Sequence, residues 1–545
     1  MHTLLKKTTE CILIILILSS CYQSEEADLV VHNATIYSVD QEFSTHEAMA
    51  IKDGKIIELG PEREILNRYS AKEKIDAKKQ FVYPGFFDAH SHFLGFAQNK
   101  GELNLFGVKS YEELLKRSAD FAKNSNREWL VGRGWDQNLW EDNSFPTKTG
   151  LDSLFPDRPV FLTRVDGHAA LLNSEAMKRA GITDTSQIAG GAILKGKDGK
   201  PTGVLVDKAA DQVENTIPPM DVDQRLDLLK KAERECFEAG LTSVTDAGLF
   251  VEDIELLDSL SSGGDLKIRI YAMLAQSEDA KEFMKNGPYK TNRLHVSSLK
   301  IYTDGALGSR GALLKAPYSD DPDNYGLKLI KDSVFNEYLN LAFESGFQVC
   351  SHGIGDSANA YILKNYAKVL NGMNDLRWRV EHAQIVDPED LHLFKNFGII
   401  PSVQPVHATS DKSWAEERLG PERIEYAYAY NTLKSQLGWI PLGTDFPVEP
   451  ISPIENFYAA VFRKSPHREE PKGYRTEEAL TREDALRGLT FWPALASFEE
   501  KEKGSLEPGK FADFVILDTD LMKATEKRIL STKVVATYLD GVKVN

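Results

Sequence analysis

The sequence lacks a basic cluster, a membrane-spanning apolar run and a rich set of cysteines. Its formal net charge is −17 with no patch of lysine and arginine, which argues against nucleic acid as a partner. The apolar run from Cys11 to Leu18 is too short to cross a bilayer as a helix. Four cysteines in 545 residues leave little scope for a disulfide framework. With 42% hydrophobic and 27% charged residues, the composition is that of a globular protein with a large core.

Residues 1–20 have the pattern of a signal peptide. Lys6 and Lys7 precede the apolar run, and Leu18-Ser-Ser-Cys21 resembles the lipobox of bacterial lipoproteins, whose cysteine is acylated. We therefore predict an exported protein with a lipid anchor on Cys21, held at the periplasmic or extracellular face of a bacterial membrane. Residues 21–27 would form a short polar tether. The alternative is an ordinary secretory peptide with a coincidental cysteine.

Processing and lipidation would leave Cys236 and Cys350 as the cysteines able to pair in an oxidising compartment. Each lies in a segment that we predict to be a buried helix or strand. We expect no disulfide, and a packing role for Cys350.

Short alternating runs at both ends of the chain predict strands. Residues 28–81 alternate apolar and polar positions and contain Asp53-Gly54, a signal for a two-residue hairpin turn. Residues 504–545 contain similar runs. We predict that 28–81 and 504–545 together form one small β-sandwich.

Between the two ends, one unit recurs: a helical stretch, a glycine, an apolar strand, and a polar residue where the strand ends. Repeated helix and strand units imply a parallel sheet, and a glycine after each helix suits the left-handed conformation that ends it. The eight predicted strands end near His92, Asp246, Met273, Asp304, His352, His382, Gln404 and Asp445. We predict an α/β fold, a TIM (β/α)8 barrel over residues 82–503, with an inserted cap at about 103–220.

Histidines gather at these predicted strand ends. His90 and His92 follow an apolar strand, and alternation points both imidazoles to one side, where they can chelate one ion. His352, His382 and Asp445 end three further strands. A histidine pair alone is often a surface feature, but barrels of this kind carry their chemistry at the C-terminal strand ends. The pattern therefore predicts a metal site there.

Four motifs resemble amidohydrolase family 3, and in particular its YtcJ-like group that includes N-substituted formamide deformylase. They are Pro84-Gly-Phe-Phe-Asp-Ala-His-Ser-His92, Asp304-Gly-Ala-Leu-Gly-Ser-Arg310, Gly443-Thr-Asp-Phe-Pro447 and Gly504-Ser-Leu-Glu-Pro-Gly-Lys-Phe-Ala-Asp513. The order HxH, Lys, His, His, Asp also resembles the wider amidohydrolase superfamily. The resemblance covers essentially all of the mature chain.

The resemblance implies one or two divalent metal ions, Zn²⁺ first among them, held by imidazole and oxygen ligands. One ion would take His90, His92, Lys300 and Asp445, and the other Lys300, His352 and His382. Lys300 would have to be carboxylated or deprotonated, because an ammonium group cannot bind a cation. The alternative is a lysine paired with Asp304 or Asp445.

The same resemblance implies hydrolysis of a non-peptide C–N bond, in an amide, N-formyl or cyclic amide substrate, by metal-activated water. Asp445 would act as general base, or, as the alternative, only orient a histidine. His168, Arg310 and His407 are weaker substrate-binding candidates. Their alternative roles are a buried histidine, a structural salt bridge and a residue of a lid loop.

Other functions stay open at this point. A deaminase on the same barrel typically has Glu three residues after the later histidine, where this chain has Gly355. Ester or phosphotriester hydrolysis shares the lysine and remains an alternative. A non-enzymatic solute-binding lipoprotein would be two-lobed and would have no ligand set, which the sequence does not favour.

Overall fold

The computed structural model describes residues 24–125, 127–218, 220–468 and 471–545. The predicted signal peptide and the lipidation residue Cys21 lie outside the described residues. Among the helices that are described, none combines the length and the apolar character needed to cross a membrane. Cys236 and Cys350 are both buried and free.

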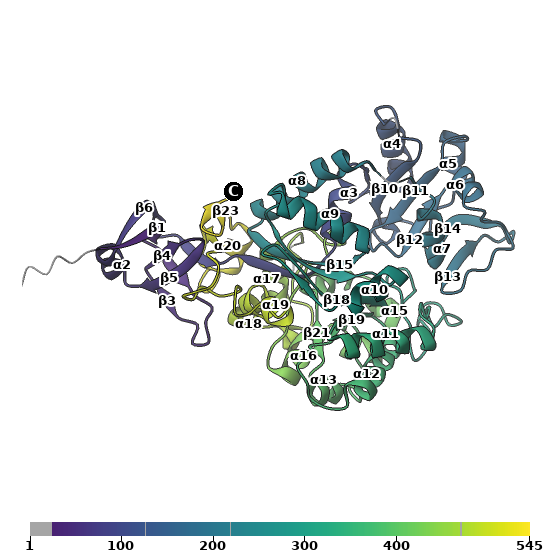
Figure 1. The fold of residues 1–545 in the computed structure, drawn as a ribbon. Helices are drawn as coiled ribbons and strands as arrows, with labels where there is room; N and C mark the ends of the chain where they lie inside the picture. The colour runs from purple at the N-terminus through teal and green to yellow at the C-terminus, as the bar shows by residue number, and fades with distance from the viewer. Residues whose placement is uncertain (1–23, 126, 219, 469–470) are drawn as a thin grey trace, which may run out of the picture.

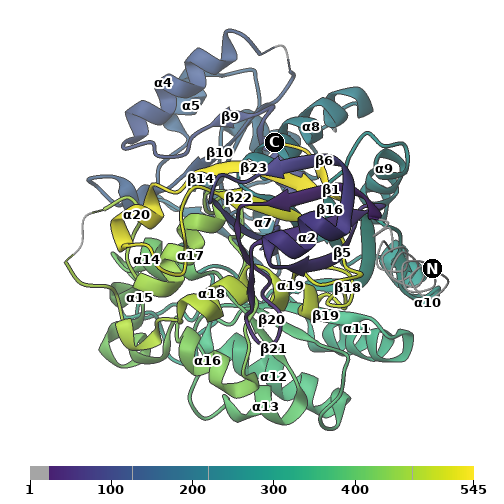
Figure 2. The ribbon, with the colours of Figure 1, turned by 90° about the vertical axis from the view of Figure 1, so that its left-hand side faces the viewer.

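Parallel strands form the centre of the molecule, and the helices that connect them lie around them (Figures 1 and 2). Seven strands follow one another in the order β21-β20-β19-β18-β16-β15-β8. They are β8 (Phe86–Ser91), β15 (Leu241–Leu249), β16 (Arg269–Leu274), β18 (Leu294–Tyr302), β19 (Gln348–Gly353), β20 (Arg379–His382) and β21 (Ile400–Ser402). Helices such as α9 (Val251–Ser262), α11 (Asp332–Ser345), α12 (Asp356–Leu370) and α13 (His392–Phe397) separate them in sequence. A parallel barrel is what this alternation dictates, because parallel neighbours need a long crossover.

The eighth barrel position differs from the prediction. Instead of a regular strand ending at Asp445, the segment makes one isolated parallel bridge, between Val403 and Leu442. Pro441 has no N–H to donate to a ladder, which keeps the pairing short. The backbone N–H of Asp445 nevertheless donates to the carbonyl of His90 at 2.8 Å. The barrel is therefore nearly closed by seven strands, and Asp445 is held beside β8.

Two turn predictions are confirmed. Gly346 and Gly398 end α11 and α13 with φ angles of 74° and 63°, the left-handed region that favours glycine. Asp53-Gly54 joins the antiparallel strands β4 (Ala48–Lys52) and β5 (Lys55–Gly60), with φ angles of 51° and 73°.

Both chain ends contribute strands to two further sheets, which lie at one side of the barrel (Figure 1). The first has the order β5-β4-β1-β6 and the second β24-β23-β22-β7-β2-β3. The added strands are β1 (Glu25–His32), β2 (Thr35–Tyr37), β3 (Thr45–His46), β6 (Tyr69–Asp76), β7 (Phe81–Pro84), β22 (Phe514–Leu517), β23 (Val534–Leu539) and β24 (Val542–Lys543). Apolar residues of both sheets, such as Val31, Ile51 and Ile516, share one core. β22 pairs with β7, so the C-terminal segment is tied directly to the strand before β8.

The region predicted as a cap forms a sheet of its own, on the other side of the barrel from the β1–β6 strands (Figure 1). We call it the β9–β14 sheet; its order is β13-β14-β12-β11-β10-β9. Its strands are β9 (Leu103–Asn104), β10 (Leu130–Trp135), β11 (Val160–Arg164), β12 (Ala169–Leu172), β13 (Gly191–Lys195) and β14 (Pro201–Asp207). Its apolar residues gather in two clusters separate from the barrel core.

Glu499 and Lys503 form a buried ion pair at the amino-terminal end of the barrel strands. Glu499 Oε2 lies 2.8 Å from Lys503 Nζ, and Glu499 Oε1 lies 3.4 Å from Nδ1 of His295, near the start of β18. Burial raises the pKa of Glu499, but Lys503 and His295 outweigh it and lower the pKa from 4.5 to about 2. Because the folded pKa is depressed, this stabilisation is present above the unfolded pKa and is lost as the pH falls from about 4.5 toward about 2.

We expect Glu499→Gln to cost about 3–5 kcal/mol at neutral pH, because Lys503 keeps a buried charge without its partner. Urea unfolding at a series of pH values measures the effect, and the difference from the parent should shrink as Glu499 becomes protonated. The double variant Glu499→Gln/Lys503→Met is the control; it removes both charges and should recover most of the loss. A stability difference that stays constant with pH would contradict the lowered pKa.

Candidate metal centre

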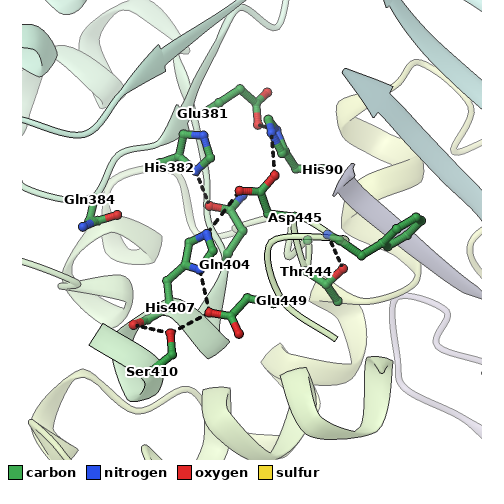
Figure 3. Close-up of polar contacts among 12 residues, drawn as sticks. His90, Glu381, His382, Gln384, Gln404, His407, Ser410, Thr444, Asp445 and Glu449 are labelled. Atoms are coloured by element: carbon green, nitrogen blue, oxygen red, sulfur yellow. Dashed lines mark hydrogen bonds and ion pairs between the residues drawn. The ribbon is translucent and has the colours of Figure 1, made fainter. Parts of the chain in front are cut away.

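Asp445 lies at the centre of a group of imidazoles (Figure 3). Its Oδ1 lies 3.5 Å from His90 Nε2 and 3.3 Å from His92 Nε2, and its Oδ2 lies 3.3 Å from His407 Nε2. Oδ1 is buried and accepts no hydrogen bond within the described part of the chain. Two triads, His90-His92-Asp445 and His382-His407-Asp445, each have ligand atoms within 4.8 Å of one another.

Contacts of two β8 residues, His90 and Asp88, fix the position of His90 relative to Asp445. His90 Nδ1 lies 2.7 Å from Oε2 of Glu381, which reaches across from β20. A carboxylate at Nδ1 favours the tautomer that leaves Nε2 free as a ligand. Asp88 on the same strand accepts hydrogen bonds from the N–H and hydroxyl of Thr444, at 3.0 and 2.6 Å. These contacts fix the segment that carries Asp445 against β8.

The other three predicted ligands adjoin this group. Lys300 Nζ, on β18, lies 3.2 Å from His90 Nε2. His352, on β19, has its ring centroid 4.6 Å from that of His382, on β20. His382 Nδ1 in turn lies 2.8 Å from Oε1 of Gln404. The structure thus brings all six predicted metal ligands together at the carboxyl ends of the barrel strands.

Lys300 does not form the ion pair considered as its alternative. Within the described residues, its amine is not in ion-pair contact with Asp304 or Asp445. Asp304 instead accepts backbone hydrogen bonds from Leu313, Ile354 and Gly355 at 2.8–3.2 Å. Burial lowers the pKa of Lys300, although Glu381 and Asp445 oppose this effect.

Burial also lowers the pKa values of His90, His352 and His382, which favours their neutral, ligand-competent forms. Burial raises the pKa of Asp445, but the nearby imidazoles of His407 and His92 outweigh this effect and hold the pKa well below its usual range. Neutral imidazoles with a carboxylate are a donor set that suits a divalent transition metal. The unpartnered Oδ1 of Asp445 is an oxygen ligand in the right place for one, so these residues fit a metal ion.

The weaker candidates have different surroundings. His168 reaches the site from the β9–β14 sheet: its Nδ1 lies 2.6 Å from Asp207, and its ring centroid lies 5.1 Å from that of His352. His407 lies on α14 (Pro405–Asp411), bonded to Asp445 and, at 3.0 Å, to Glu449. Arg310 instead forms an ion pair with Asp320 at 2.8 Å, the structural role given as its alternative.

Four polar residues of the site were missed from the sequence: Asp88, Glu381, Gln404 and Glu449. Glu381 carried a usable signal, since an acidic residue directly before His382 in an apolar strand is costly to bury unless it is paired. Gln404 stood at a predicted strand end without being assigned a role. The sequence had no comparable signal for Glu449, which reaches the site through His407.

A barrel of parallel strands that gathers histidines, a lysine and an aspartate at its carboxyl end defines the class of metal-dependent hydrolases with a TIM-barrel-like fold. More specifically, the chain belongs to the Amidohydrolase family, whose profile Amidohydro_3 matches residues 73–544. The family resemblance expected from the motifs is confirmed.

Relatives and solved structures agree with this assignment. The putative amidohydrolase YtcJ of Bacillus subtilis (strain 168) is 32% identical, over 94% of this chain and 98% of its own. The N-substituted formamide deformylase of Arthrobacter pascens is 27% identical, again over 94% and 98%. The structure of an uncharacterized metal-dependent hydrolase from Pyrococcus horikoshii OT3 aligns with a TM-score of 0.74 and 28% identity, covering 92% of this chain and 99% of that one.

Proposed function

We propose that this protein hydrolyses a non-peptide C–N bond, in an amide, N-formyl or cyclic amide substrate. The observation that carries the proposal is the buried, unpartnered Oδ1 of Asp445 between the imidazoles of His90 and His92. The similarity to a formamide deformylase supports the type of bond. Ester or phosphotriester hydrolysis at the same site is the alternative that the test below separates.

We propose that His90, His92, Lys300 and Asp445 hold one divalent ion, with Zn²⁺ the first choice for imidazole and oxygen donors. Lys300, His352 and His382 would hold the second, with Lys300 carboxylated so that it can serve both. The absence of an ion pair on Lys300 within the described residues supports this role. The triad His382-His407-Asp445 offers another arrangement for the second ion.

A bound divalent ion supplies Lewis acidity, which polarises the substrate carbonyl and lowers the pKa of water. In the proposed reaction, Oδ2 of Asp445 accepts the proton of the attacking water. His407 positions this carboxylate oxygen, because its Nε2 lies 3.3 Å from Oδ2. The new C–O bond forms as the C–N bond breaks, and Asp445 returns the proton to the leaving nitrogen. Burial lowers the pKa of His168, but its contact with Asp207 at Nδ1 outweighs this effect and raises the pKa to about 9, so the protonated ring can donate a hydrogen bond from Nε2 to the substrate carbonyl.

A metal assay combined with a hydrolysis screen tests the proposal. We expect purified protein to hold about one to two divalent ions per chain and to hydrolyse N-formyl amines or cyclic amides. A chelator should abolish that activity, and added Zn²⁺ should restore it. Protein that neither holds nor responds to metal would contradict the assignment. Metal-dependent cleavage of aryl esters or phosphotriesters, with no amide cleaved, would favour the alternative.

We also propose that Cys21 anchors the protein to a bacterial membrane outside the cytoplasm. The support is the sequence alone: Lys6 and Lys7, the apolar run and Leu18-Ser-Ser-Cys21. In that location the enzyme would act on small amides that reach the cell from outside.

A further inference from the structure

A cavity of about 330 Å³ lies beside the metal centre, between the barrel and the β9–β14 sheet. One wall is α3 (Phe93–Asn99), the helix that follows His92, and another is the 447–451 segment, which follows Asp445. Arg133 on β10 also lines it. Its apolar lining comprises Phe96, Leu103, Phe106, Pro447, Val448, Pro450 and Ile451. Both the volume and the lining are those of a small-molecule site.

Two hydrogen-bond donors of this lining have no partner. Arg133 Nε and Asn99 Nδ2 are both buried and unbonded within the described residues. The guanidinium of Arg133 is held from behind, because its Nη2 donates to the carbonyl of Val165 at 3.2 Å. Buried donors are usually paired in folded proteins, so two unpaired donors that line one cavity are free to bind an acceptor that a ligand brings.

Two of the other charged groups of the cavity, Lys100 and Glu449, are already paired. Lys100 pairs with Glu235 at 2.6 Å. Glu449 accepts hydrogen bonds from His407 and Ser410 at 3.0 and 2.5 Å. Burial raises the pKa of Glu102 to about 7, so its carboxyl is partly neutral near physiological pH. Arg133 is therefore the cation that remains to meet an anionic ligand.

We propose that this cavity selects substrates with an apolar group that ends in a carboxylate, bound by Arg133 and Asn99. The apolar lining would bury the hydrocarbon part, and the planar guanidinium matches a carboxylate in shape and charge. The proposal rests on the proposed function, since it places the scissile amide at the metal centre and the carboxylate in the cavity. Arg133 and Asn99 then determine specificity and take no part in the bond cleavage.

Calorimetric binding of two matched probes, 3-phenylpropanoate and its neutral amide 3-phenylpropanamide, tests the proposal without requiring turnover. The parent should bind the carboxylate at least about tenfold more tightly, the usual scale of a charged hydrogen bond. Arg133→Met should remove this preference, and Asn99→Leu should reduce it. The control is Arg63→Met, which removes the same charge from an exposed position on α2 (Glu62–Arg68), away from the cavity. It should leave the preference for the carboxylate unchanged.

A carboxylate that binds the metal ion does so equally in the parent and in Arg133→Met, so only the difference between them counts. Equal binding of the two probes by the parent, a preference of the same size in Arg133→Met as in the parent, or no binding of either probe would overturn the proposal. If the protein hydrolyses amides with and without a carboxylate equally well, the proposed function stands and the proposed role of the cavity fails. If the carboxylate probe binds through Arg133 but the protein holds no metal, the role of the cavity stands and the proposed function fails.

Discussion

Asp445→Asn should lower kcat/KM for the best amide substrate by about 10³-fold, the middle of the range for general acid–base catalysis. The amide cannot accept the proton from water, and its neutral oxygen is a weaker ligand than a carboxylate. The fold should persist, because the backbone N–H of residue 445 keeps its bond to the carbonyl of His90. Steady-state kinetics with metal analysis of the same samples measures both effects.

A matched substitution controls for the change from acid to amide. Asp120→Asn alters an exposed carboxylate that pairs with Lys123, and exposed pairs contribute little, so the rate should change less than about twofold. If Asp445→Asn lowers kcat/KM by less than about tenfold while the metal content is unchanged, Asp445 does not act as the general base and only orients a histidine.

The four histidine ligands and Asp445 could be predicted because each stands at the end of an apolar run. Parallel strands bring such positions to one edge of a barrel, so His352 and His382 meet although 30 positions separate them in sequence. Lys300 had no such signal of its own, and its assignment depended on the resemblance to a family.

Glu381 was missed because strand alternation places it on the opposite face from His382. The backbone breaks that alternation: His382 has a φ of 70° and Ala383 a φ of 40°. With the turn at the strand's end, Glu381 reaches His90 and His382 still reaches the site. Side-chain alternation assumes extended φ angles, so it fails where a strand ends in a left-handed residue.

The eighth strand was overpredicted for a related reason. The run from Ile440 to Asp445 is apolar and follows a helix and a glycine, as the other strands do. Its ladder is reduced by Pro441, and Asp445 itself has a φ of 63°. The predicted position of this segment in the barrel is correct, but the segment does not form the regular strand ladder that was predicted.

Lys300→Ala should remove most of the bound metal and, with it, the hydrolytic activity. Lys300 Nζ is buried 3.2 Å from His90 Nε2 and, among the described residues, has no carboxylate in ion-pair contact. If it serves both ions, its loss should weaken metal binding by at least about tenfold, the lower end of what even an indirect change at a metal site costs. Metal content after dialysis at a buffered Zn²⁺ concentration measures the loss.

Two further variants separate a ligand from a merely structural lysine. Lys503→Ala removes another buried lysine, which pairs with Glu499 at the opposite end of the barrel, and should lower stability while the metal stays bound. Lys300→Glu supplies a carboxylate oxygen on a shorter side chain and should retain more metal than Lys300→Ala. If Lys300→Ala instead keeps the parent's metal content, Lys300 is not a ligand, and the triads that include Asp445 must hold the ion without it.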